Sequence, residues 1–67
     1  MDRRKLIQDL TRAGFINRGG GNHDVYVRGN VHTVVPRHGE ISESLAMAIY
    51  RQAGLDYPGR HRKEGQP

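Results

Sequence analysis

The feature that most constrains the fold is the dipeptide Gly29-Asn30, which separates two runs rich in β-branched and aromatic residues. The runs cover residues 24–28 and 31–35. A two-residue loop that begins with glycine is typical of a tight β-hairpin with a type II′ turn, because glycine accepts the positive φ that this turn needs. The sequence therefore predicts two antiparallel strands with one fixed register.

The predicted register determines which side chains share a face of the hairpin. It places Arg28 opposite Val31 and His23 opposite Pro36, and side chains alternate between the two faces along each strand. One face then carries His23, Val25, Val27, His32 and Val34, and the other carries Tyr26, Val31, Thr33 and Val35. Because both faces carry apolar residues, the alternation does not indicate which one the rest of the chain covers.

Helical periodicity flanks the hairpin on both sides. Between Asp2 and Ala13 apolar residues recur at spacings of three and four, with Asp2 as the N-cap and Gly14 as the stop signal. A second stripe lies between a Ser42 cap and a stop at Gly54. The stripe positions are Leu6, Ile7, Leu10 and Ala13 in the first helix, and Ile41, Leu45, Ala48, Ile49 and Gln52 in the second.

These elements combine into one domain. Residues 15–18 add a short edge strand, and Pro36 is expected to end the last strand because it has no N–H to donate. We predict an α+β fold of order α-β-β-β-α, a two-layer sandwich with two helices on one face of a three-stranded antiparallel sheet. Residues 1–55 form this domain, since 67 residues are too few for two cores. Residues 56–67 are rich in proline, glycine and charge and are expected to be a disordered basic tail.

Composition limits the possible partners. Eleven Lys and Arg against seven Asp and Glu give a net charge of +4, which favours phosphate-rich or acidic partners. Arg3, Arg4 and Arg12 fall on the polar side of the first helix and are interpreted as a solvated face. The chain has no cysteine and no run approaching the ~20 apolar residues that span a bilayer. We therefore expect a cytoplasmic protein without membrane contact.

A glycine run marks the candidate site, where Gly19, Gly20, Gly21 and Asn22 lead into His23. Glycines are favoured where the backbone bends sharply or comes close to another group. Imidazole has an unperturbed pKa near neutrality, so a histidine exposed after such a bend can give or take a proton. The alternative interpretation is a flexible loop followed by an ordinary surface histidine.

Other catalytic arrangements find little support in the sequence. The glycines lack the lysine of a phosphate-binding P-loop. His23, His32 and His38 match no zinc spacing, so no metal and no cofactor are expected. No serine elbow and no fixed pair of carboxylates is visible. Acid–base chemistry by one histidine beside arginines remains, and it suits RNA cleavage because the ribose 2′-hydroxyl is a built-in nucleophile.

Residues 3–55 resemble the HicA toxins of bacterial type II toxin–antitoxin systems. Five features in order carry the resemblance: Ala13-Gly14-Phe15 at the end of the first helix, the glycines before His23, the aromatic Tyr26, the run Val34-Val35-Pro36-Arg37-His38, and Arg51-Gln52-Ala53-Gly54-Leu55 at the end of the second helix. The family's common Gly-Ser-His is Gly21-Asn22-His23 here.

The resemblance implies a double-stranded-RNA-binding-domain-like fold and an mRNA interferase, a metal-independent endoribonuclease, with His23 at the catalytic position. It also implies a HicB-like antitoxin that covers the active site and represses the operon, and no direct DNA binding is expected without this antitoxin. The charge pattern suggests that Arg37 and one of Arg18 or Arg28 contact the phosphate, with His38 as a second proton donor.

Alternatives remain open from the sequence. Arg37 could instead pair with Glu40 at the rim of the site. The whole chain could be a non-catalytic RNA-binding module, since the same element order serves duplex RNA recognition by shape. It could also be an adaptor whose basic face docks an acidic protein.

Overall fold

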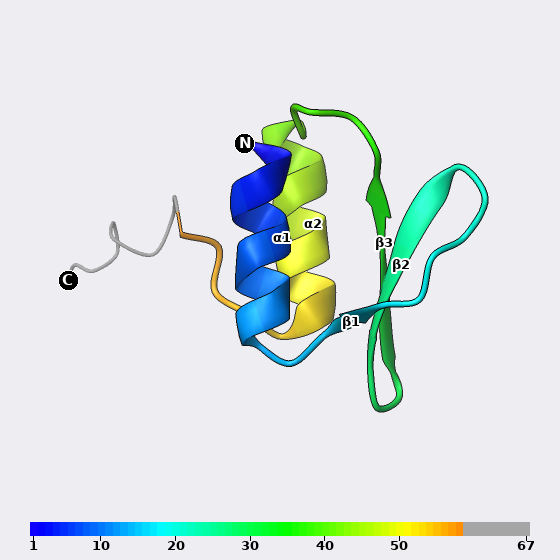
Figure 1. Ribbon diagram of the computed structural model, residues 1–67. Helices are drawn as coiled ribbons and strands as arrows, with labels where there is room; N and C mark the ends of the chain where they lie inside the picture. Colours follow the sequence, from blue (N-terminus) through cyan, green and yellow to red (C-terminus); the bar gives the residue numbers. More distant parts are fainter. Residues whose placement is uncertain (59–67) are drawn as a thin grey trace, which may run out of the picture.

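The computed structural model describes residues 1–58 of the 67-residue chain. In this part, helices and strands follow in the predicted order: α1 Arg3–Arg12, β1 Ile16–Asn17, β2 His23–Arg28, β3 Val31–Pro36 and α2 Glu43–Ala53. The strands form an antiparallel sheet of order β1-β2-β3. Both helices lie side by side against one face of this sheet (Figure 1). The predicted two-layer α+β sandwich is therefore confirmed.

The β2–β3 hairpin has the predicted register, from Arg28 opposite Val31 to His23 opposite Pro36. Gly29 has a φ of +60°, whereas Asn30 does not have a positive φ, which is the combination that a type II′ turn requires. The hairpin ends at Pro36, as expected. Local turn chemistry thus determines the position of every hairpin residue relative to its partner.

The first strand is shorter than residues 15–18. Only Ile16 and Asn17 belong to β1. The residues on either side of it do not continue the regular pairing with β2. Phe15 is 3% exposed and belongs to the core. Arg18 takes part in an irregular pairing with Val25 that ends the strand.

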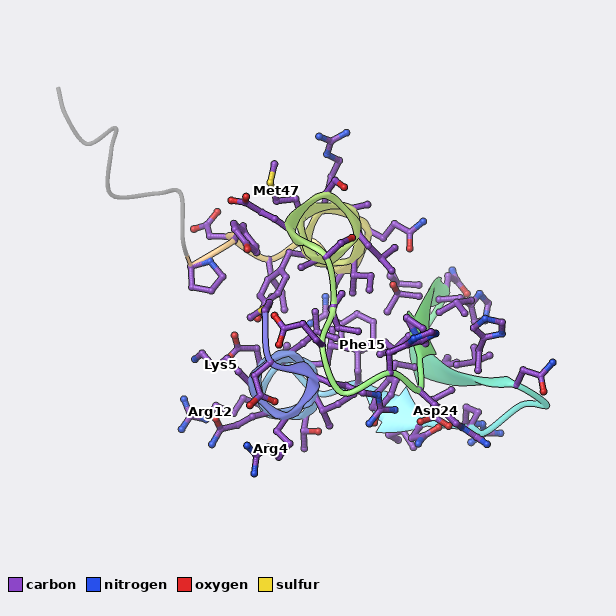
Figure 2. All side chains as sticks on the ribbon, turned by 90° about the horizontal axis from the view of Figure 1, so that it is seen from above. Arg4, Lys5, Arg12, Phe15, Asp24 and Met47 are labelled. Atoms are coloured by element: carbon purple, nitrogen blue, oxygen red, sulfur yellow. The ribbon has the colours of Figure 1, made fainter. Side chains whose placement is uncertain are left out.

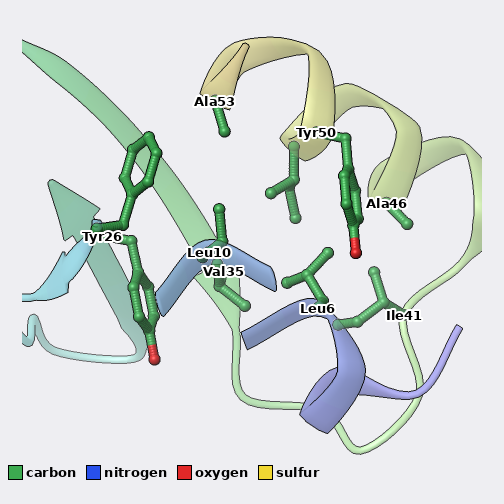
Figure 3. Close-up of a cluster of buried hydrophobic side chains, with 10 residues drawn as sticks. Leu6, Leu10, Tyr26, Val35, Ile41, Ala46, Tyr50 and Ala53 are labelled. Carbon is green, nitrogen blue, oxygen red and sulfur yellow. The ribbon is translucent and has the colours of Figure 1, made fainter. Parts of the chain in front are cut away.

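Burial shows which face of the sheet the helices cover. Tyr26, Thr33 and Val35 on one face are buried, whereas His23 and Val34 on the other are exposed. The buried face packs against side chains from both helices (Figure 3). The core consists of Leu6, Leu10, Phe15, Tyr26, Val35, Ile41, Ala46, Ile49, Tyr50 and Ala53.

Both helix caps are as predicted. The Asp2 carboxylate accepts a hydrogen bond from the Arg4 N–H at 2.8 Å, and the Ser42 hydroxyl accepts one from the Leu45 N–H at 3.3 Å. Gly54 ends α2 in the left-handed conformation with a φ of +76°.

The apolar stripe predicted for α2 is partly wrong. Leu45, Ala48 and Gln52 are exposed, while Tyr50 is buried. The Tyr50 ring can enter the core because its hydroxyl donates a hydrogen bond to the carboxylate of Asp9 on α1. Leu45, Ala48 and Gln52 instead lie beside Val34 and Pro36 of β3.

The segment after α2 continues along the core. The ring of Tyr57 packs edge-to-face on the ring of Tyr50, with centroids 5.4 Å apart. The tail was predicted for residues 56–67, and Tyr57 of this segment packs on the core. Residues 59–67 lie outside the described part, so for them the disordered tail stays a prediction. Within residues 1–58, neither helix is long and apolar enough to cross a membrane.

Candidate functional site

The glycine run begins with an ordered change in strand pairing. The Arg18 N–H donates to the Val25 carbonyl at 2.7 Å, and the Val25 N–H donates to the Gly19 carbonyl at 2.9 Å. Two residues thus oppose one, which is the arrangement of a β-bulge. The Gly19 N–H also binds the side-chain oxygen of Asn17 at 2.8 Å. The start of the loop is therefore held by specific hydrogen bonds.

The bend itself is centred on Gly20. Its φ is +140°, and a Cβ atom built there would lie 2.5 Å from the carbonyl oxygen of His23. A Cβ on Gly21 would meet nothing within 4 Å. Of these two positions, only position 20 requires glycine, because its backbone lies too close to the His23 carbonyl for any side chain to fit. His23 is the candidate catalytic residue.

His23 is the first residue of β2 and is exposed. It lines an open hollow of about 340 Å³ between the end of the hairpin and α2. Its side chain is the only titratable one among the described residues that line this hollow. The lining residues are His23, Val34, Pro36, Leu45, Ala48, Ile49 and Gln52.

Arg37 and Arg3 converge on Asp24, the residue after His23. Arg37 donates to one carboxylate oxygen from Nε at 3.0 Å and from Nη2 at 2.9 Å. Arg3 donates to the other oxygen and also, from Nε, to the Pro36 carbonyl at 2.8 Å. The hydrogen bonds from Arg37, with a smaller contribution from Arg3, hold the pKa of the Asp24 carboxyl below its ordinary value.

This arrangement corrects two sequence interpretations. Arg37 pairs with Asp24 and not with Glu40, whose carboxylate binds the Met1 amino group at 2.7 Å. Arg3 does not belong to a solvated face, since its side chain is only 23% exposed. The signal that could have revealed both contacts is the inward-facing strand position of Asp24, because a buried carboxylate requires cationic partners.

Arg4 and Arg12 on α1 are exposed, as the sequence predicts. Figure 2 shows Arg4, Lys5 and Arg12 pointing from α1 away from the sheet, whereas Asp24 lies at the end of the sheet. Arg4 binds Asp2 at 3.0 Å, and Lys5 binds Asp9 at 3.1 Å along the same helix. These cations therefore lie apart from the hollow beside His23.

The remaining predicted phosphate ligands lie at different distances from His23. Arg28 is at the opposite end of β2, about 16 Å away along the strand. Its guanidinium lies over the Phe15 ring, 4.8 Å from the centroid, and donates to the Ala13 carbonyl at 2.7 Å. The structure therefore does not bring Arg28 to His23.

Arg18 and His38 lie nearer to His23. Arg18 is exposed and pairs with Val25, whose side chain shares the open sheet face with His23. His38 lines a separate hollow of about 280 Å³, which shares Pro36 and Leu45 with the hollow of His23. Within residues 1–58, no group of three or more potential ligands is arranged to hold a metal ion.

The fold and the site define a small, basic α+β domain that presents one histidine at a glycine bend. The family model described as the HicA toxin of bacterial toxin–antitoxin matches residues 3–55, and the chain belongs to this family. It is thus the toxin of a toxin–antitoxin pair, of a nuclease-type class, and has an antitoxin partner. The chain has no match among curated proteins or among solved structures.

Proposed function

We propose that this toxin is a metal-independent endoribonuclease that cleaves mRNA, with His23 as its catalytic residue. The observation that carries the proposal is the exposed position of His23 on an open hollow, behind a bend that requires Gly20. A histidine in this position can reach a bound nucleotide and exchange protons with solvent.

The proposed reaction uses the ribose 2′-hydroxyl as the nucleophile. His23 removes the hydroxyl proton, the oxygen attacks the adjacent phosphorus, and the bond from phosphorus to the 5′-oxygen breaks, leaving a 2′,3′-cyclic phosphate and a 5′-hydroxyl. His38, in the adjoining hollow, is a candidate to protonate the departing oxygen. DNA lacks the nucleophile and is not a substrate for this chemistry.

Arg18 is the best-placed candidate to stabilise negative charge on the phosphate. It is exposed, and its N–H bonds to the carbonyl of Val25, whose side chain lies on the same face as His23. Arg37 can contribute only from its outer side, because Nε and Nη2 are engaged by Asp24. We therefore favour Arg18 over Arg28 as the second phosphate ligand.

We further propose that a HicB-like antitoxin covers the open face of the sheet. Ile16 and Val34 are 61% and 48% exposed on that face, and exposed apolar side chains gathered on one face favour contact with a protein partner. Binding of the antitoxin would bury them together with His23. A melting temperature that does not rise when the cognate antitoxin is added would count against this pairing.

The test compares RNA cleavage by the unmutated chain, His23→Ala and His32→Ala in the presence of EDTA. His32 is an appropriate control because it is exposed on the same face, four strand positions or about 13 Å away. His23→Ala is expected to lose about 10²–10⁴-fold in rate, and His32→Ala to retain activity.

Each alternative has its own outcome. Equal cleavage by His23→Ala would remove His23 from the mechanism, and cleavage that depends on added metal would refute the mechanism itself. Salt-sensitive duplex binding without turnover would indicate an RNA-binding module. No RNA affinity at any salt concentration would indicate an adaptor for an acidic protein.

A further inference from the structure

We propose that Asp24, held by Arg3 and Arg37, is a positioning residue that fixes the strand end carrying His23. The inference rests on the proposed function of His23 and goes beyond it, because it assigns a role to residues that do not line the hollow. We refer to Asp24, Arg3 and Arg37 as the carboxylate clamp.

The clamp contacts the backbone around His23 on three sides. Asp24 directly follows His23, and Pro36, whose carbonyl accepts from Arg3, is the strand partner of His23. Arg37 Nη2 also lies 3.5 Å from the carbonyl of Gly20, the residue that approaches the His23 backbone. The same ion-pair cluster therefore restrains the bend, the strand partner and the neighbouring residue at once.

The end of the hairpin needs such support. His23 and Pro36 form a non-hydrogen-bonded pair, because the Val25 backbone two residues further along β2 bonds on the β1 side, so no ladder bond to β3 holds His23 itself. On the other side, the strand is preceded by glycines that have no side chains to pack. Because adjacent side chains in a strand point to opposite faces, fixing Asp24 toward the helices directs His23 toward the open face.

Stability alone does not explain an acidic residue at this position. Asp24 is 8% exposed and lies opposite Val35, which is fully buried on the same face. A carboxylate buried in an ion pair adds little stability compared with an apolar residue of similar size, since it loses its hydration, while the Arg37 side chain that pairs with it stays 51% exposed. An apolar residue would serve the core at this position, so the carboxylate points to a requirement for geometry.

The test compares Asp24→Asn with Asp9→Asn. Asp9 is a matched control, since its side chain is 17% exposed against 12% for Asp24 and it also forms an ion pair and accepts a second hydrogen bond. It lies on α1 and does not line the hollow of His23. Both variants remove a charge while keeping the shape of the side chain.

Two measurements separate positioning from loss of fold. The first is kcat and KM for RNA cleavage under conditions where each variant is folded by circular dichroism. Asp24→Asn should lower kcat by about tenfold to hundredfold with little change in KM, as a misplaced reacting group does, and Asp9→Asn should leave kcat unchanged. Asp24→Glu, which keeps the charge, should recover part of the loss.

The second measurement is amide hydrogen exchange across residues 20–25, and it needs no cleavage. Exchange should become faster in Asp24→Asn but not in Asp9→Asn. Equal kcat changes in the two variants, or equal exchange rates, would overturn the inference. If the unmutated chain cleaves no RNA, the proposed function fails, while the exchange comparison still decides whether the clamp orders the strand end.

Discussion

Replacing Gly20 with alanine tests the bend that exposes His23. The added Cβ would lie 2.5 Å from the His23 carbonyl oxygen, whereas ordinary contact begins at 3.4 Å, so the two groups must separate by about 0.9 Å. The φ of +140° adds backbone strain, because side chains rarely allow this conformation. Both effects act on the same short segment.

The expected loss of stability follows from this one close contact and the backbone strain. A residue forced into a conformation reserved for glycine costs about 1–3 kcal/mol, before any cost of moving the His23 backbone. A domain of this size has a net stability of only about 3–5 kcal/mol. With a urea m-value of about 1 kcal/mol/M, the unfolding midpoint should fall by about 1–3 M.

Urea unfolding monitored by circular dichroism measures this loss, with Gly21→Ala as the matched control. A side chain at Gly21 meets nothing within 4 Å, and its φ lies outside the range that side chains avoid. The control should therefore be neutral, or more stable by about 0.4–1 kcal/mol through the unfolded chain. Because a shift of about 1 Å at a reacting group costs about 10²-fold, the folded fraction of Gly20→Ala should also cleave RNA far more slowly.

Equal urea midpoints for Gly20→Ala and Gly21→Ala would refute this reasoning. They would mean that the His23 carbonyl moves aside freely and that the close approach does not constrain the loop. Normal cleavage by a destabilised Gly20→Ala would separate the two effects, and would show that the bend serves the fold alone.

Two further predictions concern acid stability and the core. Since Arg37 lowers the pKa of Asp24 in the folded state, the ionised carboxylate stabilises the fold above its ordinary pKa of 3.8, and this contribution is lost as the pH falls through the lowered value. The difference in urea midpoint between the unmutated chain and Asp24→Asn should therefore shrink below about pH 4, and a constant difference would contradict the linkage. Leu10 is 1% exposed, so Leu10→Ala should cost about 2–5 kcal/mol, which is comparable with the whole net stability of the domain. Ile16→Ala, at a position that is 61% exposed, should leave stability unchanged, and equal losses for the two variants would show that the core is misassigned.

The hairpin and the order of the elements were predictable because they depend on neighbouring residues. Gly29 determines the turn, the turn determines the register, and Pro36 ends the strand without reference to the rest of the chain. The caps at Asp2 and Ser42 are equally local. The position of His23 at the start of β2, opposite Pro36, follows from the same short-range pattern.

The parts that were not predictable depend on contacts between distant segments. Side chains alternate between the two faces of the hairpin, and both faces carry apolar residues. Only packing against the helices therefore shows that Tyr26 is buried and Val34 exposed. The burial of Tyr50 in place of Leu45 required an acceptor on α1, which α2 alone cannot indicate. Arg37 lies close to Asp24 within the β2–β3 hairpin itself, but only packing against the helices shows that Asp24 is on the covered face, where it requires a cationic partner.

The long sequence separations within the carboxylate clamp bear on the order of assembly. Arg3 is 21 positions from Asp24 and 33 from Pro36, whereas the hairpin closes through a two-residue turn. Closing long loops costs more entropy than closing short ones, so the hairpin can form early and the clamp only after α1 has docked. A chain whose first helix has not yet docked could still form the β2–β3 hairpin, but Arg3 would not bind Asp24 and Pro36 beside His23. On the proposed function, the chain would then gain its RNA-cleaving activity only in the last step of folding.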